Sequence, residues 1–184
     1  MDINMNYVDE KRRMEEALQL DPDNRSVLDE YFDILRNISM RSLGLFTARL
    51  PGIANPIYLR ANTSDILNFG QIFLNDEYGF EFLVEPRRIL DLGGYAGYAA
   101  LYLNRRFPQA EIVSVEPSVD NYGMLRLNTV NVTRISAVNG AIWNVPGFVG
   151  RSGLEDEHWG HRISVIDDSN KQSRSIEGNC SPPI

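Results

Sequence analysis

The sequence predicts an α/β fold, and three observations support this prediction. Residues 87–138 alternate short apolar runs, typical of buried strands, with segments whose apolar residues recur at helical spacing. The connections between these segments are short, which favours parallel strands joined by right-handed crossovers. A glycine-rich turn, Gly93 to Gly97, joins the first strand to its helix. The length of 184 residues suits one compact domain or a small domain with an appendage.

Residues 1–50 are predicted to form an N-terminal helical appendage. Proline cannot continue a helix and aspartate favours turns, so Asp21-Pro22-Asp23 separates a first helix from a second one. Asn24 or Ser26 provides a cap for the second helix, which runs to about residue 38. The apolar residues of this helix fall at helical spacing: Leu28, Tyr31, Phe32 and Leu35.

Residues 51–86 are predicted to form a separate segment with one strand and one helix. The strand is Ile57 to Arg60. The polar run from Asn62 to Asp65 then provides the cap of a helix. The apolar face of this helix consists of Ile66, Phe69, Ile72 and Phe73.

Residues 87–166 are predicted to form the main domain, in the order strand, helix, strand, helix, strand. The expected parallel strands cover residues 88–92, 111–115 and 135–138. Beyond them, the apolar runs 141–143 and 148–150 flank the turn signal Pro146-Gly147, and residues 161–166 are expected to form a further, antiparallel strand. Residues 167–184 are rich in serine and other polar residues and are predicted to form a polar tail.

The glycine turn and one acidic residue point to a binding site. Glycine lets the chain turn sharply and lets a ligand approach the backbone, and the helix behind the turn begins with N–H groups suited to an anion. Glu116 ends the second strand, about 20 residues after the glycines, where a carboxylate can accept hydrogen bonds from both hydroxyls of a ribose. In a strand–helix–strand context, this pair predicts a site for a nucleoside-containing cofactor.

Asp91 narrows the choice of cofactor. Dinucleotide enzymes use the pattern G-x-G-x-x-G around a pyrophosphate, whereas the glycines here are Gly93, Gly94 and Gly97. The Asp91 carboxylate, just before these glycines, would repel a pyrophosphate and would suit a cationic ligand. S-adenosylmethionine carries an ammonium and a sulfonium and no phosphate, so the pattern favours it as the cofactor.

A longer stretch of the sequence resembles one family of proteins. The run ILDLGGYAGYAALYLNRRFPQAEIVSVEPSVDNYGMLRLN, followed by VNGAIWNVPG, resembles the FkbM-type family of S-adenosylmethionine-dependent methyltransferases. YLRANTSDILNFGQIFLNDEY and HWGHRISV resemble the segment before the cofactor domain and the hairpin region of that family, so the likeness covers roughly residues 57–166. It implies a Rossmann-like class I methyltransferase fold, S-adenosylmethionine as cofactor, and O-methylation of a small molecule or glycan.

The resemblance also implies which residues contact the cofactor. The loop around its methionine portion matches Asp91, Gly93, Gly94, Tyr95 and Gly97, and the acid that binds its ribose matches Glu116. Asn139 and Ala141 match the region beside the adenine, and Ser64 and Asp65 match a segment that covers the site. Some of these residues have structural alternatives, such as a turn at Asn139 or a helix cap at Ser64. No catalytic base is predicted.

The sequence also departs from this family. The strand that follows the hairpin in the family has no counterpart, so the resemblance implies a fold truncated after the third parallel strand and the hairpin. Such a chain is expected to be weakly active or inactive alone. The first parallel strand, residues 88–92, would become an apolar sheet edge, which invites pairing with a second copy of the chain.

Composition argues against several other functions. The 25 acidic residues outnumber the 18 basic ones, and a net charge of −7 argues against a nucleic-acid partner. No apolar run of about 18 residues predicts a membrane span, and the N-terminus lacks a signal-peptide pattern, so a cytoplasmic location is expected. The single cysteine, Cys180, and the two histidines, His158 and His161, do not suffice for a metal site.

Three functions therefore stay open at this point. The first is an S-adenosylmethionine-dependent methyltransferase that acts on a small-molecule or glycan acceptor. The second is a nicotinamide-dependent oxidoreductase, and the third is a non-catalytic interaction module that uses the N-terminal helices. The choice of ligand separates the first two, because one cofactor is cationic and the other carries a pyrophosphate.

Overall fold

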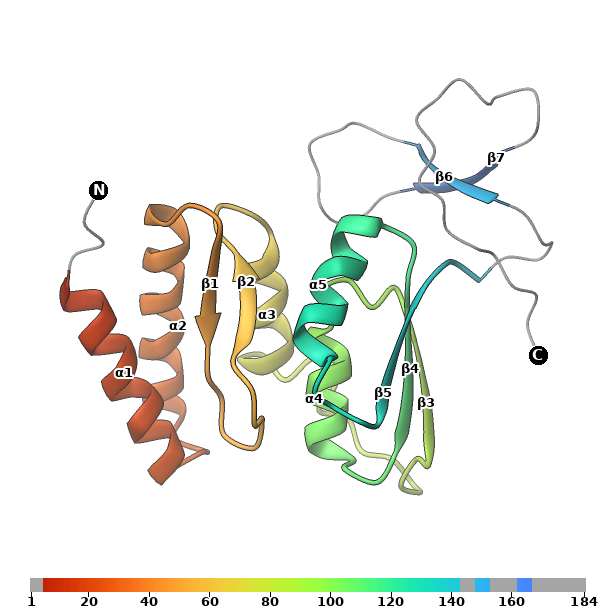
Figure 1. Ribbon diagram of the computed structural model, residues 1–184. Coiled ribbons are helices and arrows are strands. Elements are labelled where there is room, and N and C mark those ends of the chain that lie inside the picture. Colours follow the sequence, from red (N-terminus) through yellow and green to blue (C-terminus); the bar gives the residue numbers. More distant parts are fainter. Residues whose placement is uncertain (1–4, 143–147, 153–161, 167–184) are drawn as a thin grey trace. The chain divides into compact units, whose positions relative to one another are not determined.

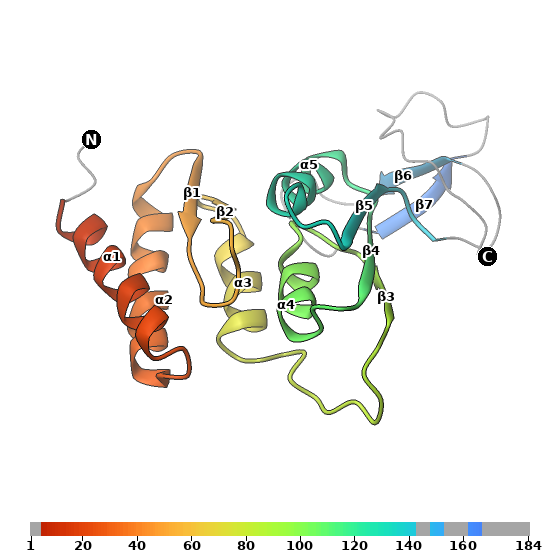
Figure 2. The same cartoon turned by 60° about the horizontal axis from the view of Figure 1, so that its bottom comes forward.

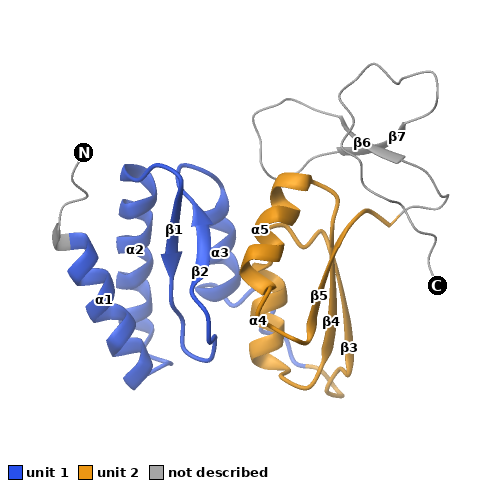
Figure 3. Cartoon of the chain, in the orientation of Figure 1, with its two compact units in different colours: residues 1–81 blue, residues 82–184 orange. Residues whose placement is uncertain are grey.

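The computed structural model of the chain describes residues 5–142, 148–152 and 162–166 (Figure 1). The chain divides into two compact units, which Figure 3 shows in different colours. The N-terminal unit is Met1–Glu81 and the C-terminal unit is Phe82–Ile184. Several sequence features lie outside the described residues: the predicted polar tail 167–184, the turn at Pro146-Gly147, His158, His161 and Cys180.

The N-terminal unit contains the elements that the sequence predicts, and one more. In chain order they are α1 (Met5–Leu20), α2 (Arg25–Arg41), β1 (Leu45–Ala48), β2 (Ile57–Arg60) and α3 (Asp65–Phe73). Asn24 caps α2, as expected, because its side-chain oxygen accepts a hydrogen bond from the Val27 N–H at 3.2 Å. The predicted helix pair, strand and third helix are therefore confirmed.

Strand β1 is the element that the sequence pattern missed. It begins just after Gly44, whose φ of +84° lies in the left-handed region, and it pairs antiparallel with β2. Leu45 lies opposite Arg60, and Ala48 lies opposite Ile57. The pairing joins residues of the predicted appendage 1–50 to residues of the predicted segment 51–86. A strand of four residues gives little periodicity, and its partner is distant in sequence.

Aromatic side chains from α2 and α3 form the centre of the N-terminal unit. Phe32 stacks against Phe69 with 5.2 Å between ring centroids, and Phe69 contacts Phe73 at 4.8 Å. Tyr31 and Leu35 of α2 are also fully buried. The predicted apolar faces of the two helices therefore pack into a shared core, where buried aromatic surface stabilises the fold.

The C-terminal unit is an α/β structure with a parallel sheet. Its strands and helices alternate: β3 (Arg88–Leu92), α4 (Tyr98–Arg106), β4 (Glu111–Glu116), α5 (Val119–Thr129) and β5 (Ile135–Asn139). The strand order is β3-β4-β5, and both pairings are parallel. This arrangement confirms the Rossmann-like alternation that the sequence predicts.

Helices α4 and α5 lie on one face of this sheet, as Figures 1 and 2 show from two directions. Ile112 and Ile135 are buried. The residues next to them in the sequence point to the opposite face of the sheet, because side chains alternate along a strand. That opposite face is apolar and exposed in the described part of the chain, at Leu90, Leu92, Val113 and Val138. Among the described strands, β3 pairs with β4 alone and forms an edge of the sheet.

A second small sheet follows β5 in the chain. Strands β6 (Phe148–Ser152) and β7 (Arg162–Ile166) pair antiparallel, which confirms the antiparallel strand expected at 161–166, and its partner is the strand that contains the run 148–150. Across the described ranges, no helix combines the length and the apolar character needed to cross a membrane.

Candidate functional site

The glycine loop turns back over the end of β4. After β3, the N–H groups of Gly93 and Gly94 both donate to the Val115 carbonyl, at 2.9 and 3.0 Å. The loop closes where the Gly97 N–H donates to the Gly94 carbonyl at 2.8 Å, and α4 begins at the next residue. Gly93 and Gly97 have φ values of +85° and +86°, a region that favours glycine. The predicted sharp turn is therefore confirmed.

Two of these glycines lie against other side chains and one faces open space. A Cβ on Gly94 would overlap the hydroxyl of Ser114, and a Cβ on Gly97 would lie 3.0 Å from Leu125 Cδ1. A Cβ on Gly93 would meet no heavy atom of the described residues within 4 Å. The loop therefore packs tightly on the sheet and on α5, and it is open beside Gly93.

Glu116, the last residue of β4, points its carboxylate at the glycine loop. One carboxylate oxygen, Oε2, accepts the Tyr95 N–H at 2.9 Å, and the other, Oε1, accepts the Ser118 N–H at 2.8 Å. The side chain of Asn121 in α5 also hydrogen-bonds to this carboxylate. Only 6% of Glu116 is exposed, and this burial raises its pKa above the ordinary value although the three hydrogen bonds favour the charged form.

The backbone of Tyr95 adopts an unusual conformation to reach this carboxylate. Its φ of +49° is left-handed, which is uncommon for a residue with a side chain. Its ring lies edge-on to that of Tyr98, with 6.2 Å between centroids. Uncommon backbone conformations of this kind cluster at ligand-binding sites, where the surrounding contacts maintain them.

Asp91 supplies a second, half-buried carboxylate whose charge acts on the first. It lies opposite Ser114 in the β3–β4 register, and its Oδ2 accepts the Ser114 hydroxyl at 2.7 Å. Burial raises the pKa of Asp91, and the Ser114 hydrogen bond offsets part of this rise. The charge of Asp91 in turn contributes to the raised pKa of Glu116. Two partly desolvated carboxylates this close favour the binding of a cation.

Asn139 and Ala141 lie at the end of the neighbouring strand β5. The Asn139 amide donates to the carbonyls of Glu116 at 2.8 Å and Pro117 at 3.3 Å, and it thereby holds the chain that leaves β4. Ala141 is buried. The carboxyl ends of the three parallel strands therefore bring Asp91, Glu116 and Asn139 to one edge of the sheet, the edge at which such folds bind ligands.

Ser64 and Asp65 belong to the N-terminal unit and make contacts there. The buried Asp65 carboxylate pairs with the Arg60 guanidinium at 2.7 Å and also accepts the Arg60 backbone N–H at 2.8 Å. Ser64 stands at the N-cap position of α3, but its side chain makes no capping bond; the Thr63 hydroxyl accepts the Asp65 N–H instead, at 3.2 Å. A role of Ser64 and Asp65 in covering a cofactor stays a prediction.

Two residues of the site were missed by the sequence reasoning. Ser114 interrupts the apolar run from Ile112 to Val115 and is fully buried. A polar residue inside an apolar run of a strand could have indicated a site residue from the sequence alone. Asn121 lies in the first turns of α5, where it reads as an ordinary surface polar residue, yet it is only 4% exposed. Ser118 stands at the N-cap position of α5 without a side-chain capping bond.

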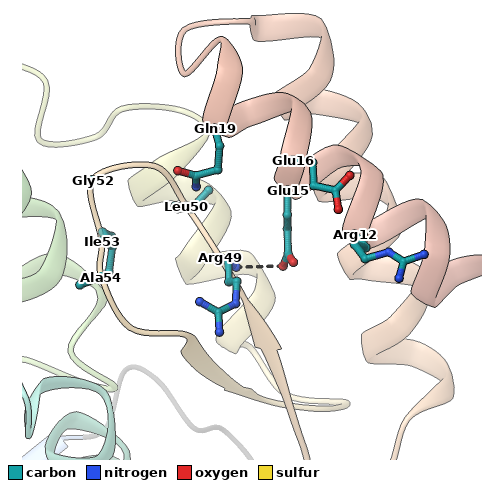
Figure 4. A pocket seen from close by; sticks show the side chains of 9 residues that line it. All are labelled: Arg12, Glu15, Glu16, Gln19, Arg49, Leu50, Gly52, Ile53 and Ala54. Atoms are coloured by element: carbon teal, nitrogen blue, oxygen red, sulfur yellow. Dashed lines mark hydrogen bonds between the residues drawn. The ribbon is translucent and has the colours of Figure 1, made fainter.

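A cleft in the N-terminal unit is a second candidate for a binding site (Figure 4). Its volume is about 800 Å³, and it lies between α1 and the turn after β1. The side-chain oxygen Oε1 of Glu15 in this cleft accepts three hydrogen bonds, from Lys11 Nζ at 2.6 Å, the Tyr31 hydroxyl at 2.8 Å and the Arg49 N–H at 3.1 Å. Glu15 therefore connects α1 to α2 and to the residue that follows β1. Charged residues of both signs line the cleft and select no class of ligand: Arg12, Glu15, Glu16 and Arg49.

No protein-family model and no curated protein matches this chain. Solved structures of methyltransferases are similar to parts of this chain at low identity. One is an S-adenosylmethionine-dependent methyltransferase from Agrobacterium tumefaciens, with 20% identity, a TM-score of 0.36, and coverage of 55% of this chain and 34% of that one. Another is TYW2 from Pyrococcus horikoshii in complex with MeSAdo, with 16% identity, a TM-score of 0.40, and coverage of 70% and 52%.

The methyltransferase FkbM from Methylobacillus flagellatus is also similar, with 11% identity, a TM-score of 0.32, and coverage of 80% of this chain and 35% of that one. The chain thus spans about a third to a half of the length of these three proteins. Likeness at this level assigns neither a substrate nor a family. Membership of the FkbM-type family stays a prediction.

Proposed function

We propose that the C-terminal unit binds S-adenosylmethionine and serves methyl transfer. One observation carries this proposal: the buried Glu116 carboxylate, at the end of β4, is aimed at the glycine loop and is influenced by the charge of a second, half-buried carboxylate, Asp91. A ribose diol requires a carboxylate at this position, and an ammonium group requires one near the loop. A single adenosyl amino acid satisfies both.

Each part of the ligand has a counterpart in the site. An ionised carboxylate offers about four acceptor positions, so Glu116 accepts a ribose hydroxyl beside its backbone donors, and a second hydroxyl replaces the Asn121 contact. The ligand's ammonium group binds Asp91. Its carboxylate would bind at the first turn of α4, which begins at Tyr98 and has Gly97 as its N-cap residue, without a side-chain capping bond. The open space beside Gly93 leaves room for this portion.

The same charges disfavour a dinucleotide. A pyrophosphate placed on this loop would lie near Asp91 and Glu116, and repulsion between like charges in a partly desolvated site costs several kcal/mol. The nicotinamide-dependent alternative is therefore the weaker one.

We further propose that the acceptor is a hydroxyl of a small molecule or glycan, as the FkbM-type resemblance implies. When bound, S-adenosylmethionine would supply a methyl group activated by its sulfonium: as the acceptor oxygen bonds to the methyl carbon, the S–CH3 bond would break, the sulfur would leave as a thioether, and the hydroxyl proton of the acceptor would pass to water. This chain's residues hold the adenosyl and amino-acid portions so that the methyl faces the acceptor, and this alignment is a large part of catalysis in such displacements.

Thermal unfolding with two competing ligands tests the proposal. We expect S-adenosylhomocysteine at about 100 times its Kd to stabilise the protein by about 2.7 kcal/mol, because it binds the folded state alone. NAD at the same concentration is expected to leave the Tm unchanged. Stabilisation by NAD and not by S-adenosylhomocysteine would favour the oxidoreductase, and no response to either ligand would favour the interaction module.

A further inference from the structure

Ser114 is a buried polar residue in an apolar strand. It lies between Val113 and Val115 in β4, and none of its surface is exposed. A buried hydroxyl costs free energy unless it forms a hydrogen bond. Ser114 meets this requirement by donating to Asp91 Oδ2 at 2.7 Å across the β3–β4 pair.

This contact fixes one oxygen of Asp91 and leaves the other one available. Within the described part of the chain, the Ser114 hydroxyl is the hydrogen-bond partner of Asp91 through Oδ2, and Oδ1 has none. The loop backbone at Gly94 lies directly on the hydroxyl, since a Cβ there would overlap Ser114 Oγ and would lie 3.3 Å from Asp91 Oδ2. The hydroxyl is therefore confined beneath the loop and aimed at Asp91.

We propose that Ser114 is a positioning residue that orients Asp91 toward the ammonium group of the ligand. The inference rests on the proposed binding of S-adenosylmethionine. Because the parallel register places Ser114 directly opposite Asp91, the hydroxyl holds the carboxylate in one rotamer. The oxygen Oδ1 then already faces the ligand, so the Asp91 side chain loses little conformational freedom on binding. Ser114 itself touches no ligand and acts only through Asp91.

Two ligands that differ only in the amino-acid portion test this role. S-adenosylhomocysteine carries the ammonium group, and 5′-methylthioadenosine keeps the adenosyl thioether but lacks the amino acid. In Ser114→Ala, calorimetric titration is expected to show about a tenfold loss of affinity for S-adenosylhomocysteine, the size of one hydrogen bond to a charged group. The affinity for 5′-methylthioadenosine is expected to change less than twofold.

Ser136→Ala is the matched control, because Ser136 is an exposed serine on the neighbouring strand β5. It is expected to leave both affinities unchanged. Ser114→Thr keeps the hydroxyl and is expected to restore the ratio of the two affinities found in the unchanged protein. A merely structural role of Ser114 would weaken both ligands in parallel in the alanine variant.

The outcomes separate this inference from the proposed function. If the unchanged protein binds both ligands and Ser114→Ala leaves their ratio unchanged, the positioning role is wrong while the cofactor proposal stands. If the unchanged protein binds neither ligand, the cofactor proposal fails and the role of Ser114 fails with it.

Discussion

Glu116→Ala is expected to weaken the binding of S-adenosylhomocysteine about a hundredfold. The variant loses both acceptors for the ribose hydroxyls, and each hydrogen bond to a charged group contributes about 1.5–3 kcal/mol. Unlike Ser114→Ala, it is expected to weaken 5′-methylthioadenosine equally, because both ligands contain the ribose. Calorimetric titration of both ligands measures the two losses.

Glu111→Ala is the matched control for this experiment. Glu111 is an exposed glutamate at the opposite end of the same strand, and its contact with Arg88 is a surface ion pair at 3.9 Å. It is expected to change neither affinity. Glu116→Gln keeps one acceptor and is expected to bind with intermediate affinity. A Glu116→Ala variant that folds and binds within twofold of the unchanged protein would contradict the assignment of the ribose site.

Arg60→Met is expected to destabilise the N-terminal unit by about 3–5 kcal/mol. Asp65 is fully buried, and Arg60 neutralises it through Nε at 3.0 Å and NH2 at 2.7 Å. Removing the guanidinium leaves a carboxylate buried without its countercharge, which is among the largest penalties that a single substitution causes. Urea unfolding, with hydrogen exchange of α2 amides to identify the unit, measures the loss.

Arg36→Met provides a control with the same residue type and the same distance. Arg36 pairs with Asp33 at 2.7 Å, but the two side chains are 48% and 70% exposed, against 15% and 0% for Arg60 and Asp65. Water screens this exposed pair, so the expected loss is below about 1 kcal/mol. Equal losses of unfolding free energy in the two variants would show that the buried Asp65 carboxylate does not need the Arg60 guanidinium.

The C-terminal unit was the more predictable part of the chain. Its strands are apolar runs bounded by turn residues, and the glycines at 93, 94 and 97 mark a place where the backbone bends sharply. These signals are local, so a single sequence displays them. Strand β1 forms by pairing with β2, from Ala48 with Ile57 to Leu45 with Arg60, and the local sequence pattern around β1 does not reveal this pairing.

The sequence predicted the two acidic residues of the candidate site, but not the residues that hydrogen-bond to them. Asp91 and Glu116 stand at positions where strands end, so their position alone suggested ligand binding. Ser114 and Asn121 matter because of cross-strand register and the packing of α5 against Glu116, which only the folded chain reveals. Ser64 and Asp65 illustrate the converse: both were selected by resemblance, and Asp65 makes a buried ion pair within its own unit.

The most direct test of the cofactor site is two-dimensional ¹H–¹⁵N NMR during titration with S-adenosylhomocysteine. The amides of Tyr95 and Ser118 both donate to Glu116, so their resonances report on any change at this carboxylate. The account predicts saturable shifts that are largest at these two amides and across residues 93–97. Shifts confined to the cleft around Glu15, or no shift at Tyr95 and Ser118 at saturation, would contradict it.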